Sequence, residues 1–405
     1  MKRHNFANVL FNYWVVLLVW QNTRGIIGNR GVIDVAIKGL LFVYLLYNYL
    51  IFSKMIKSNV FILTMVLGVS CIIPISQYIS FDVILYYLFP VFLFFLTLGC
   101  GGKVEISKTE LVKTCKKVVF VVGYIVAYAI VFCWDQFRSA FSITYAYGNE
   151  LRSFLDSNCE YGLYLSFAVV SILLILEYDQ GLTTSMKNVY LYLIGLYTIN
   201  LILTFSRTTI VMYAIMIFFY VIAWKKGRLR NTIACFVMML LIIIVISPKV
   251  NNLIINKIFL EKGDSGRSML VQLGINIFEE SSIYNKLFGS NSTVVMTQIQ
   301  SNTRLSSFHN AYIQILVTNG IKGVVFLVGV ILFSIHDNIK TVIKKPEFRN
   351  YPILSIGFVV AAIFYMLTTT GTLFYSSIDS YFLTIMVILL PKYVNNAIRN
   401  NNFEM

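Results

Sequence analysis

The chain contains twelve separate runs of apolar residues, and each run is long enough to cross a membrane as a helix. A spanning helix needs about 20 mostly apolar residues, because the hydrocarbon core of a bilayer is roughly 30 Å thick. Hydrophobic residues make up 58% of the 405 residues, which is more than soluble globular proteins carry. We therefore predict an all-α polytopic membrane protein. The predicted helices lie near residues 5–22, 32–52, 59–79, 82–100, 117–134, 160–178, 189–205, 208–224, 231–247, 311–333, 352–373 and 377–395.

Lys and Arg are concentrated in the loops that connect alternate helices, and they set the predicted orientation. Positive charge resists translocation, so basic loops stay in the cytoplasm. The even number of helices then places Met1 and Met405 on the cytoplasmic side as well. We interpret the net charge of +15 as this topology signal rather than as a sign of nucleic-acid binding. The basic loops are residues 53–58, 101–117, 224–230 and 336–350.

Two loops on the opposite, outer side are long, at residues 135–159 and 248–308. Long loops held by a rigid scaffold are where binding and catalytic residues gather. Within the second loop, which lies between predicted helices 9 and 10, Ser268 to Phe278 carries apolar residues at helical spacing. We expect an amphipathic helix near the membrane surface there. The whole chain, 1–405, is expected to form one integral membrane domain.

The sequence offers no pattern typical of a metal site, a nucleotide site or an ion-coupled transporter. Its six cysteines lack metal-ligand spacing, and we expect Cys133 and Cys159, the two on the outer side, to be free thiols. No glycine-rich phosphate loop is present. Internal repeats and acidic residues at mid-membrane depth, which are typical of many transporters, are also missing. We therefore expect neither a metal nor a cofactor.

Arginines on the outer side run against the positive-inside bias, and Arg207 is the most unusual of them. It stands alone between two apolar runs, and an unpaired charge at a helix centre costs about 2.5 to 3.5 kcal/mol. One interpretation is an interfacial anchor, and the other is a phosphate ligand, since a guanidinium has a fork of donors that matches phosphate oxygens. Arg152 and Arg267 could join it from the long loops or could be solvated loop charges. The outer arginines are Arg24, Arg30, Arg138, Arg152, Arg207, Arg267 and Arg304.

His309 is the only histidine predicted on the outer side. An ordinary imidazole pKa near 6.5 would let this side chain take a proton from a hydroxyl near neutral pH. The residue stands just before a predicted helix, level with lipid headgroups, although a structural or interfacial histidine is the alternative interpretation. The Asn319-Gly320 pair and Gly323 within that helix are expected to permit a bend or close helix packing.

Four groups of residues follow one another in the second half of the chain. They are Arg152 with Asn158 and Gly162; Thr204-Phe205-Ser206-Arg207; Ser265-Gly266-Arg267 with Gly274 to Phe278 and Phe288-Gly289; and Phe308-His309-Asn310 with Asn319-Gly320 and Gly323. In this order they resemble motifs of the O-antigen polymerase and O-antigen ligase superfamily of bacterial inner-membrane glycan enzymes. The resemblance covers residues 145–335, and the N-terminal third is similar only as hydrophobic helices.

The resemblance implies a membrane-embedded substrate, undecaprenyl diphosphate that carries an oligosaccharide. It implies that Arg207 and His309 are catalytic, with the histidine activating the acceptor hydroxyl. The residues expected to bind the diphosphate are Arg152, Arg207, Arg267 and Arg304. Polymerases of this family are often described with a glycine soon after the first arginine, and Ser153 and Phe154 stand at that place here.

We expect a metal-independent glycosyltransferase, and we favour an O-antigen or capsule polymerase that moves a growing glycan onto a lipid-linked repeat unit. The first alternative is a ligase that transfers the glycan to lipid A core. The second is a flippase or other transporter of lipid-linked oligosaccharides, which needs no long outer loop beside a histidine. The sequence leaves open the sugars, the linkage, the stereochemical outcome, the oligomeric state and a chain-length-regulating partner.

Overall fold

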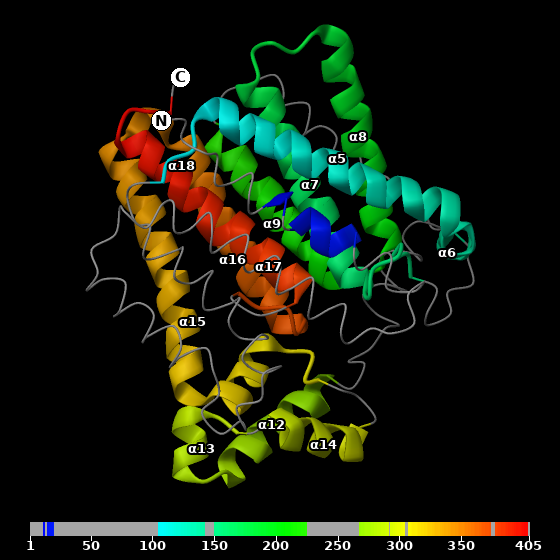
Figure 1. Cartoon of the computed structure of the whole chain (residues 1–405), viewed down its shortest axis with the longest axis vertical. Helices are drawn as coiled ribbons and strands as arrows, with labels where there is room; N and C mark the ends of the chain where they lie inside the picture. The colour runs from blue at the N-terminus through cyan, green and yellow to red at the C-terminus, as the bar shows by residue number, and fades with distance from the viewer. Residues whose placement is uncertain are drawn as a thin grey trace. The chain divides into compact units, whose positions relative to one another are not determined.

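The computed structural model describes residues 11–12, 14–19, 104–141, 150–224, 267–290, 292–303, 307–373 and 377–403. All regular structure in this part of the chain is helical, as predicted (Figure 1). Six of the described helices are long and apolar enough to cross a membrane, which fits a polytopic membrane protein. The chain divides into two compact units. Unit 1 consists of Met1–Ser107, Gly266–Lys340 and Tyr365–Met405, and unit 2 consists of Lys108–Ser265 and Thr341–Phe364.

Unit 2 is built around α7 (Asn158–Tyr178), which is apolar on all sides. A helix of this kind has no face suited to water and is normally covered by its neighbours. Every residue of α7 from Glu160 to Ile175 is indeed buried. The helices packed against α7 are α5 (Lys108–Phe132), α8 (Thr184–Leu203) and α9 (Arg207–Ala223). A short helix, α6 (Trp134–Phe141), follows α5.

Tyrosine hydroxyls tie the helices of unit 2 together, because a buried polar group without a partner is costly. Tyr161 of α7 donates to the side-chain oxygen of Asn200 in α8 at 3.0 Å. Tyr197 of α8 donates to the carbonyl of Val119 in α5 at 2.9 Å. These two bonds fix the rotation of α8 against both of its neighbours.

Close approach of helices in unit 2 depends on small residues, which let backbones come together. A Cβ atom at Gly162 of α7 would overlap the side chain of Thr209 in α9. Another helix, α16, covers Asn350–Thr368, and within its unit 2 part a Cβ atom at Gly357 would overlap Phe219 of α9. A short 3-10 helix, η2 (Pro346–Phe348), precedes α16.

Unit 1 contains three short helices followed by a long one. The short helices are α12 (Arg267–Glu280), α13 (Ile283–Phe288) and α14 (Ser292–Thr303), and the long one is α15 (Ala311–Lys344). Figure 1 shows the three short helices grouped at one end of α15. The range in which apolar spacing predicts an amphipathic helix lies within α12. Gly320 interrupts α15 with φ of 70°, so the bend expected at Asn319-Gly320 is confirmed.

The last helical segment of unit 1 is continuous and fully buried along its apolar length. It runs through α17 (Ile378–Thr384), a π-helical turn η3 (Ile385–Leu389) and α18 (Leu390–Arg399). Phe382 of α17 packs against Trp14 from the N-terminal segment, with ring centroids 4.5 Å apart.

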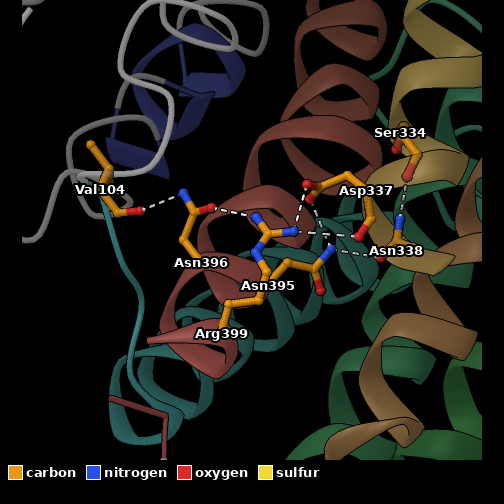
Figure 2. A network of polar contacts seen from close by, with 7 residues as sticks. All are labelled: Val104, Ser334, Asp337, Asn338, Asn395, Asn396 and Arg399. Carbon is orange, nitrogen blue, oxygen red and sulfur yellow. Dashed lines mark hydrogen bonds and ion pairs between the residues drawn. The ribbon is translucent and has the colours of Figure 1, made fainter. Parts of the chain in front are cut away.

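A network of polar side chains fixes α18 to α15 within unit 1 (Figure 2). The Arg399 guanidinium forms an ion pair with Asp337 at 2.7 Å, and both side chains are largely buried. Asn395 donates to Asp337 and to Asn338 at 3.1 and 2.9 Å. A second nitrogen of Arg399 donates to Asn396 at 2.7 Å, and Asn396 in turn donates to the carbonyl of Val104 at 3.1 Å.

Several predicted boundaries differ from the structure. The long helix α15 continues to Lys344 through residues predicted as a basic loop, since Ile335, Ile339 and Val342 keep the apolar face in helical register. Likewise α5 begins at Lys108, ahead of the predicted residue 117. The runs at 189–205 and 208–224 are two separate helices, α8 and α9, as predicted, although α8 begins earlier, at Thr184. The predicted helices at 32–52, 59–79, 82–100 and 231–247 lie outside the described residues.

We predict that the Arg399–Asp337 pair stabilises unit 1. Asp337→Asn should cost about 1.5–3 kcal/mol, because it removes a hydrogen-bonded charge pair and leaves the guanidinium uncompensated. Thermal unfolding of the purified protein in detergent measures the loss. The swapped pair Asp337→Arg with Arg399→Asp should recover part of the stability. Equal melting temperatures for the wild type and Asp337→Asn would contradict the role given to this pair.

Candidate functional site

Arg207 stands at a break between two apolar helices of unit 2. Helix α8 ends at Leu203 and α9 begins at Arg207 itself. Between them Phe205 adopts φ of 48°, a left-handed conformation that is uncommon for a bulky residue. The Ser206 side chain caps α9 by accepting the backbone N–H of Thr209 at 3.4 Å. The break therefore places Arg207, half-buried, in the first turn of a helix.

The segment 151–159 docks onto this break through three contacts. The backbone N–H of Leu151 donates to the carbonyl of Leu203 at 3.2 Å. The side-chain amide of Asn158 donates to the carbonyl of Thr204 at 2.9 Å. The sulfur of Cys159 lies 3.3 Å from the Ser206 hydroxyl oxygen. The segment that carries Arg152 and the break that carries Arg207 are thus joined in one substructure, although 55 positions separate the two arginines in the numbering.

Ser153 holds the backbone next to Arg152 in an unusual conformation. Its φ is 59°, in the left-handed region that favours glycine, and its hydroxyl donates to the carbonyl of Ile125 in α5 at 3.0 Å. The carbonyl of Arg152 accepts the N–H of Leu155 at 3.2 Å, which closes a turn. Ser153 stands where the family resemblance leads one to look for a glycine, and it adopts a glycine-like backbone. The Ser153 side chain is buried, whereas the side chain of the neighbouring Arg152 is exposed.

The helices α7 and α9 both begin at this substructure, and their N-termini favour the binding of an anion. Ser157 caps α7 by accepting the N–H of Glu160 at 3.0 Å, and Ser206 caps α9. The N-terminus of a helix carries partial positive charge and favours anions such as phosphate. Glu160 is buried and accepts the Tyr164 hydroxyl at 2.9 Å. Arg152 and Arg207 are thus carried by two docked segments at which two helices begin, and guanidinium groups are well suited to bind phosphate oxygens.

His309 stands in unit 1 just before α15, between two neighbours that are firmly held. Phe308 is fully buried in a cluster that includes Leu270 and Ile299. The Asn310 side chain caps α15 by accepting the N–H groups of Tyr312 and Ile313 at 3.0 and 3.1 Å. His309 itself adopts φ of 50° and remains half-buried. The backbone that carries the imidazole is therefore fixed on both sides.

Glycines of the predicted motifs bring the short helices against α15. A Cβ atom at Gly274 of α12 would overlap Ile313 and crowd Phe308. Gly289, with φ of 94°, leaves room for the carbonyl of Thr318, and a Cβ atom at Gly320 would overlap the backbone of 287–289. These glycines allow the short helices to pack closely against α15 near His309, and they have no reactive side chain of their own.

Burial and a nearby cation both lower the pKa of His309 below its ordinary value of 6.5. Desolvation disfavours the imidazolium most, and the positive charge of Arg267 at the start of α12 disfavours it further. Imidazole is therefore the main form at neutral pH. A neutral, half-buried imidazole that is already deprotonated can accept a proton from a hydroxyl.

The structure divides the predicted site residues between the two units. Arg152 and Arg207 belong to unit 2, on segments that dock onto each other, while Arg267 and His309 belong to unit 1. Arg304 lies outside the described residues. Cys133 and Cys159 are not joined to each other by a disulfide. Within the described ranges no group of three His, Cys, Asp or Glu side chains could hold a metal ion.

Sequence reasoning missed the left-handed backbone at Ser153, Phe205 and His309. Each of these residues lies at, or within two positions of, a predicted site residue. Strained backbone of this kind costs of order 1–3 kcal/mol and gathers at functional sites. The only signal in the sequence was the serine in place of an expected glycine after Arg152.

Comparison with known families supports the resemblance. Residues 192–328 match the family described as O-antigen ligase. The matched region runs from α8 to the middle of α15 and includes Arg207, Arg267 and His309, whereas Arg152 precedes it. A search of curated proteins finds no significant match to this chain.

We predict that position 153 tolerates glycine better than valine. Ser153→Val should cost about 1–3 kcal/mol more than Ser153→Gly, since a β-branched side chain is strained at positive φ. The melting temperatures of the purified variants measure the difference. Ser139, in the helix α6, is the matched control, and there the order should reverse because glycine weakens a helix. A more stable valine variant at position 153 would contradict the left-handed backbone.

We also predict that His309 titrates below free histidine and that Arg267 contributes to the shift. Diethylpyrocarbonate modifies a histidine only while its imidazole is neutral, so the rate of modification at His309 should rise through a midpoint below pH 6.5. Mass spectrometry of the 309-containing peptide, from protein in nanodiscs, gives this midpoint without any substrate. Arg267→Gln should raise the midpoint, because it removes a repelling charge, and Arg267→Lys should leave it low. A midpoint at or above that of N-acetylhistidine would contradict the assignment.

Proposed function

We propose that this chain, whose residues 192–328 match the family described as O-antigen ligase, is a bacterial polysaccharide polymerase. It transfers a growing O-antigen or capsule glycan from undecaprenyl diphosphate onto a lipid-linked repeat unit. The reaction takes place at the outer face of the plasma membrane, and both termini of the chain are cytoplasmic. The observation that carries the proposal is the docking of the Arg152 segment onto the break before Arg207.

The arginines suit the leaving group of such a transfer. When the bond between the anomeric carbon and the diphosphate oxygen breaks, the bonding electrons leave with undecaprenyl diphosphate. Arg152 and Arg207, with the N-termini of α7 and α9, offer positive charge to this developing anion. Fixed donors aimed at developing charge are among the largest catalytic contributions in enzymes. No metal or nucleotide enters this proposal.

His309 suits the acceptor side of the same reaction. An acceptor sugar hydroxyl attacks the anomeric carbon, and its proton passes to the neutral imidazole as the new glycosidic bond forms. The lowered pKa of His309 keeps the imidazole unprotonated before the reaction. Arg267, which contributes to that lowered pKa, is a further candidate to hold the diphosphate. Arg304 stays a sequence-based candidate for the same role.

A ligase shares this chemistry and is the alternative function, with lipid A core as the acceptor. The matched family description names a ligase, and this observation favours the alternative. We prefer a polymerase, which the sequence favours, and the identity of the acceptor is the point that an experiment must decide. A flippase is the third candidate, and it gives His309 no chemical role.

We predict that Arg207→Ala lowers glycan transfer about 10²- to 10³-fold, since one charge-stabilising donor is lost. His309→Asn should lower it about 10²- to 10⁴-fold, because asparagine tolerates left-handed backbone but is no base. The length of surface glycan made by each variant, expressed in a deletion strain at equal protein level, is the measurement. Arg138→Ala and His336→Ala, both at exposed positions, are the controls and should give normal ladders. Normal ladders from Arg207→Ala and His309→Asn would refute the catalytic assignment.

The null strain separates the polymerase from the ligase. Loss of a polymerase should leave single repeat units on the surface lipid, whereas loss of a ligase should leave none there and should accumulate polymer on the carrier lipid. In a host that makes capsule, the same comparison is made on capsule chain length. If polymer accumulates on the carrier lipid in the null strain, the protein is a ligase and not a polymerase.

A further inference from the structure

Helix α13 exposes an unusual amount of apolar surface for so short an element. Its Ile283 side chain is 78% exposed, Tyr284 is 50% exposed and Leu287 is 44% exposed. These three large side chains fall within one six-residue helix. A contiguous exposed apolar patch of this kind indicates contact with a membrane or with another protein.

The C-terminal end of α13 packs tightly onto α15 within unit 1. The N–H of Ser290 donates to the carbonyl of Val317 at 2.9 Å. Gly289 leaves room for the Thr318 carbonyl, and Gly320 leaves room for the carbonyl of Leu287. The position of α13 is therefore fixed relative to the bend in α15.

Beyond this bend, α15 presents an apolar stripe of exposed side chains. The stripe consists of Ile321, Val325, Val328 and Leu332, each at least 43% exposed. Spacings of four, three and four residues place them on one face of the helix. Because α15 is a candidate membrane span, this face suits lipid. Helix α13 is held against α15 where the stripe begins, so the two exposed apolar surfaces lie at the same end of the candidate span.

Residues typical of a membrane interface surround this surface. Tyr284 is an aromatic residue of the kind enriched at the level of lipid headgroups. Lys286 lies within α13, and the Lys322 ammonium lies 5.9 Å from the ring centroid of Phe288. Lysines in such places extend their charge to the headgroups while their stems stay among apolar groups.

We propose that α13 is an interfacial membrane anchor whose apolar side chains insert among the lipids beside α15. Because Gly289 and Gly320 couple α13 to the bend in α15, the anchor also sets the depth of the helices that hold Phe308 and His309. The proposal concerns a lipid surface as partner, and it does not depend on the reaction proposed above. A second copy of the chain on the same face is the competing occupant.

Photo-crosslinking of the full chain in nanodiscs tests this anchor. p-Benzoylphenylalanine is introduced at Tyr284 or Leu287 and irradiated in a bilayer of phosphatidylethanolamine and phosphatidylglycerol. Val325 of the apolar stripe is the lipid-facing control, and the exposed Gln298 of α14 is the polar control. Tyr284 is the more conservative site, since one aromatic side chain replaces another, and size-exclusion chromatography checks that each variant is folded.

We expect intact-mass spectra to show a phospholipid adduct at positions 284, 287 and 325 and none at 298. An adduct at 325 without adducts at 284 and 287 would overturn the proposal, as would adducts no more abundant at 284 than at 298. A crosslinked dimer from position 284 or 287 in place of the lipid adduct would assign the face to a second copy. The double variant Ile283→Asn with Leu287→Asn should weaken the adduct at 284, because polar side chains favour withdrawal from lipid.

Discussion

Inside an apolar bundle, a backbone that leaves the helical path must find new partners for its polar groups, because lipid offers none. The break at 204–206 meets this constraint with groups from another part of the chain. The Asn158 amide satisfies the Thr204 carbonyl, the Leu151 N–H satisfies the Leu203 carbonyl, and Ser206 caps the next helix. The same bonds bring the segment of Arg152 to the helix that begins with Arg207. A requirement of backbone hydrogen bonding thus brings together the two segments that carry Arg152 and Arg207.

Unit 1 solves a related problem with glycine instead of amide side chains. Here three short helices must approach the start of α15 closely enough to bury Phe308, and Gly274, Gly289 and Gly320 remove the side chains that would prevent it. The result is a fixed, half-buried His309 whose pKa is lowered by burial and by Arg267. Both units therefore hold a candidate reactive group on backbone that is not free to adjust.

Much of the fold could be predicted from the sequence, because apolar runs of spanning length leave few alternatives to membrane helices. The bend at Gly320 and the separation of α8 from α9 could also be predicted, since Asn-Gly and a lone Arg207 interrupt the apolar patterns. The helical continuation of α15 to Lys344 was not, because Lys and His residues gave that stretch the composition of a loop. The arginines and the histidine stood out because such residues are rare on the predicted outer side. The left-handed Ser153 and Phe205 did not, since their conformations come from tertiary contacts that no local pattern encodes.

The polar network of Figure 2 has a consequence for the order in which unit 1 forms. Asn396 bonds to Val104, and Asn402 bonds to Glu105 at 2.6 Å, so these contacts close loops of nearly three hundred residues. Residues 104–105 leave the ribosome long before α18 is made, so they lack these hydrogen-bond partners during most of synthesis. Closing so long a loop is entropically expensive for a free chain, but spanning helices already inserted in the bilayer shorten the effective distance. The membrane thus acts as a template that keeps the two ends within reach until the last helix arrives.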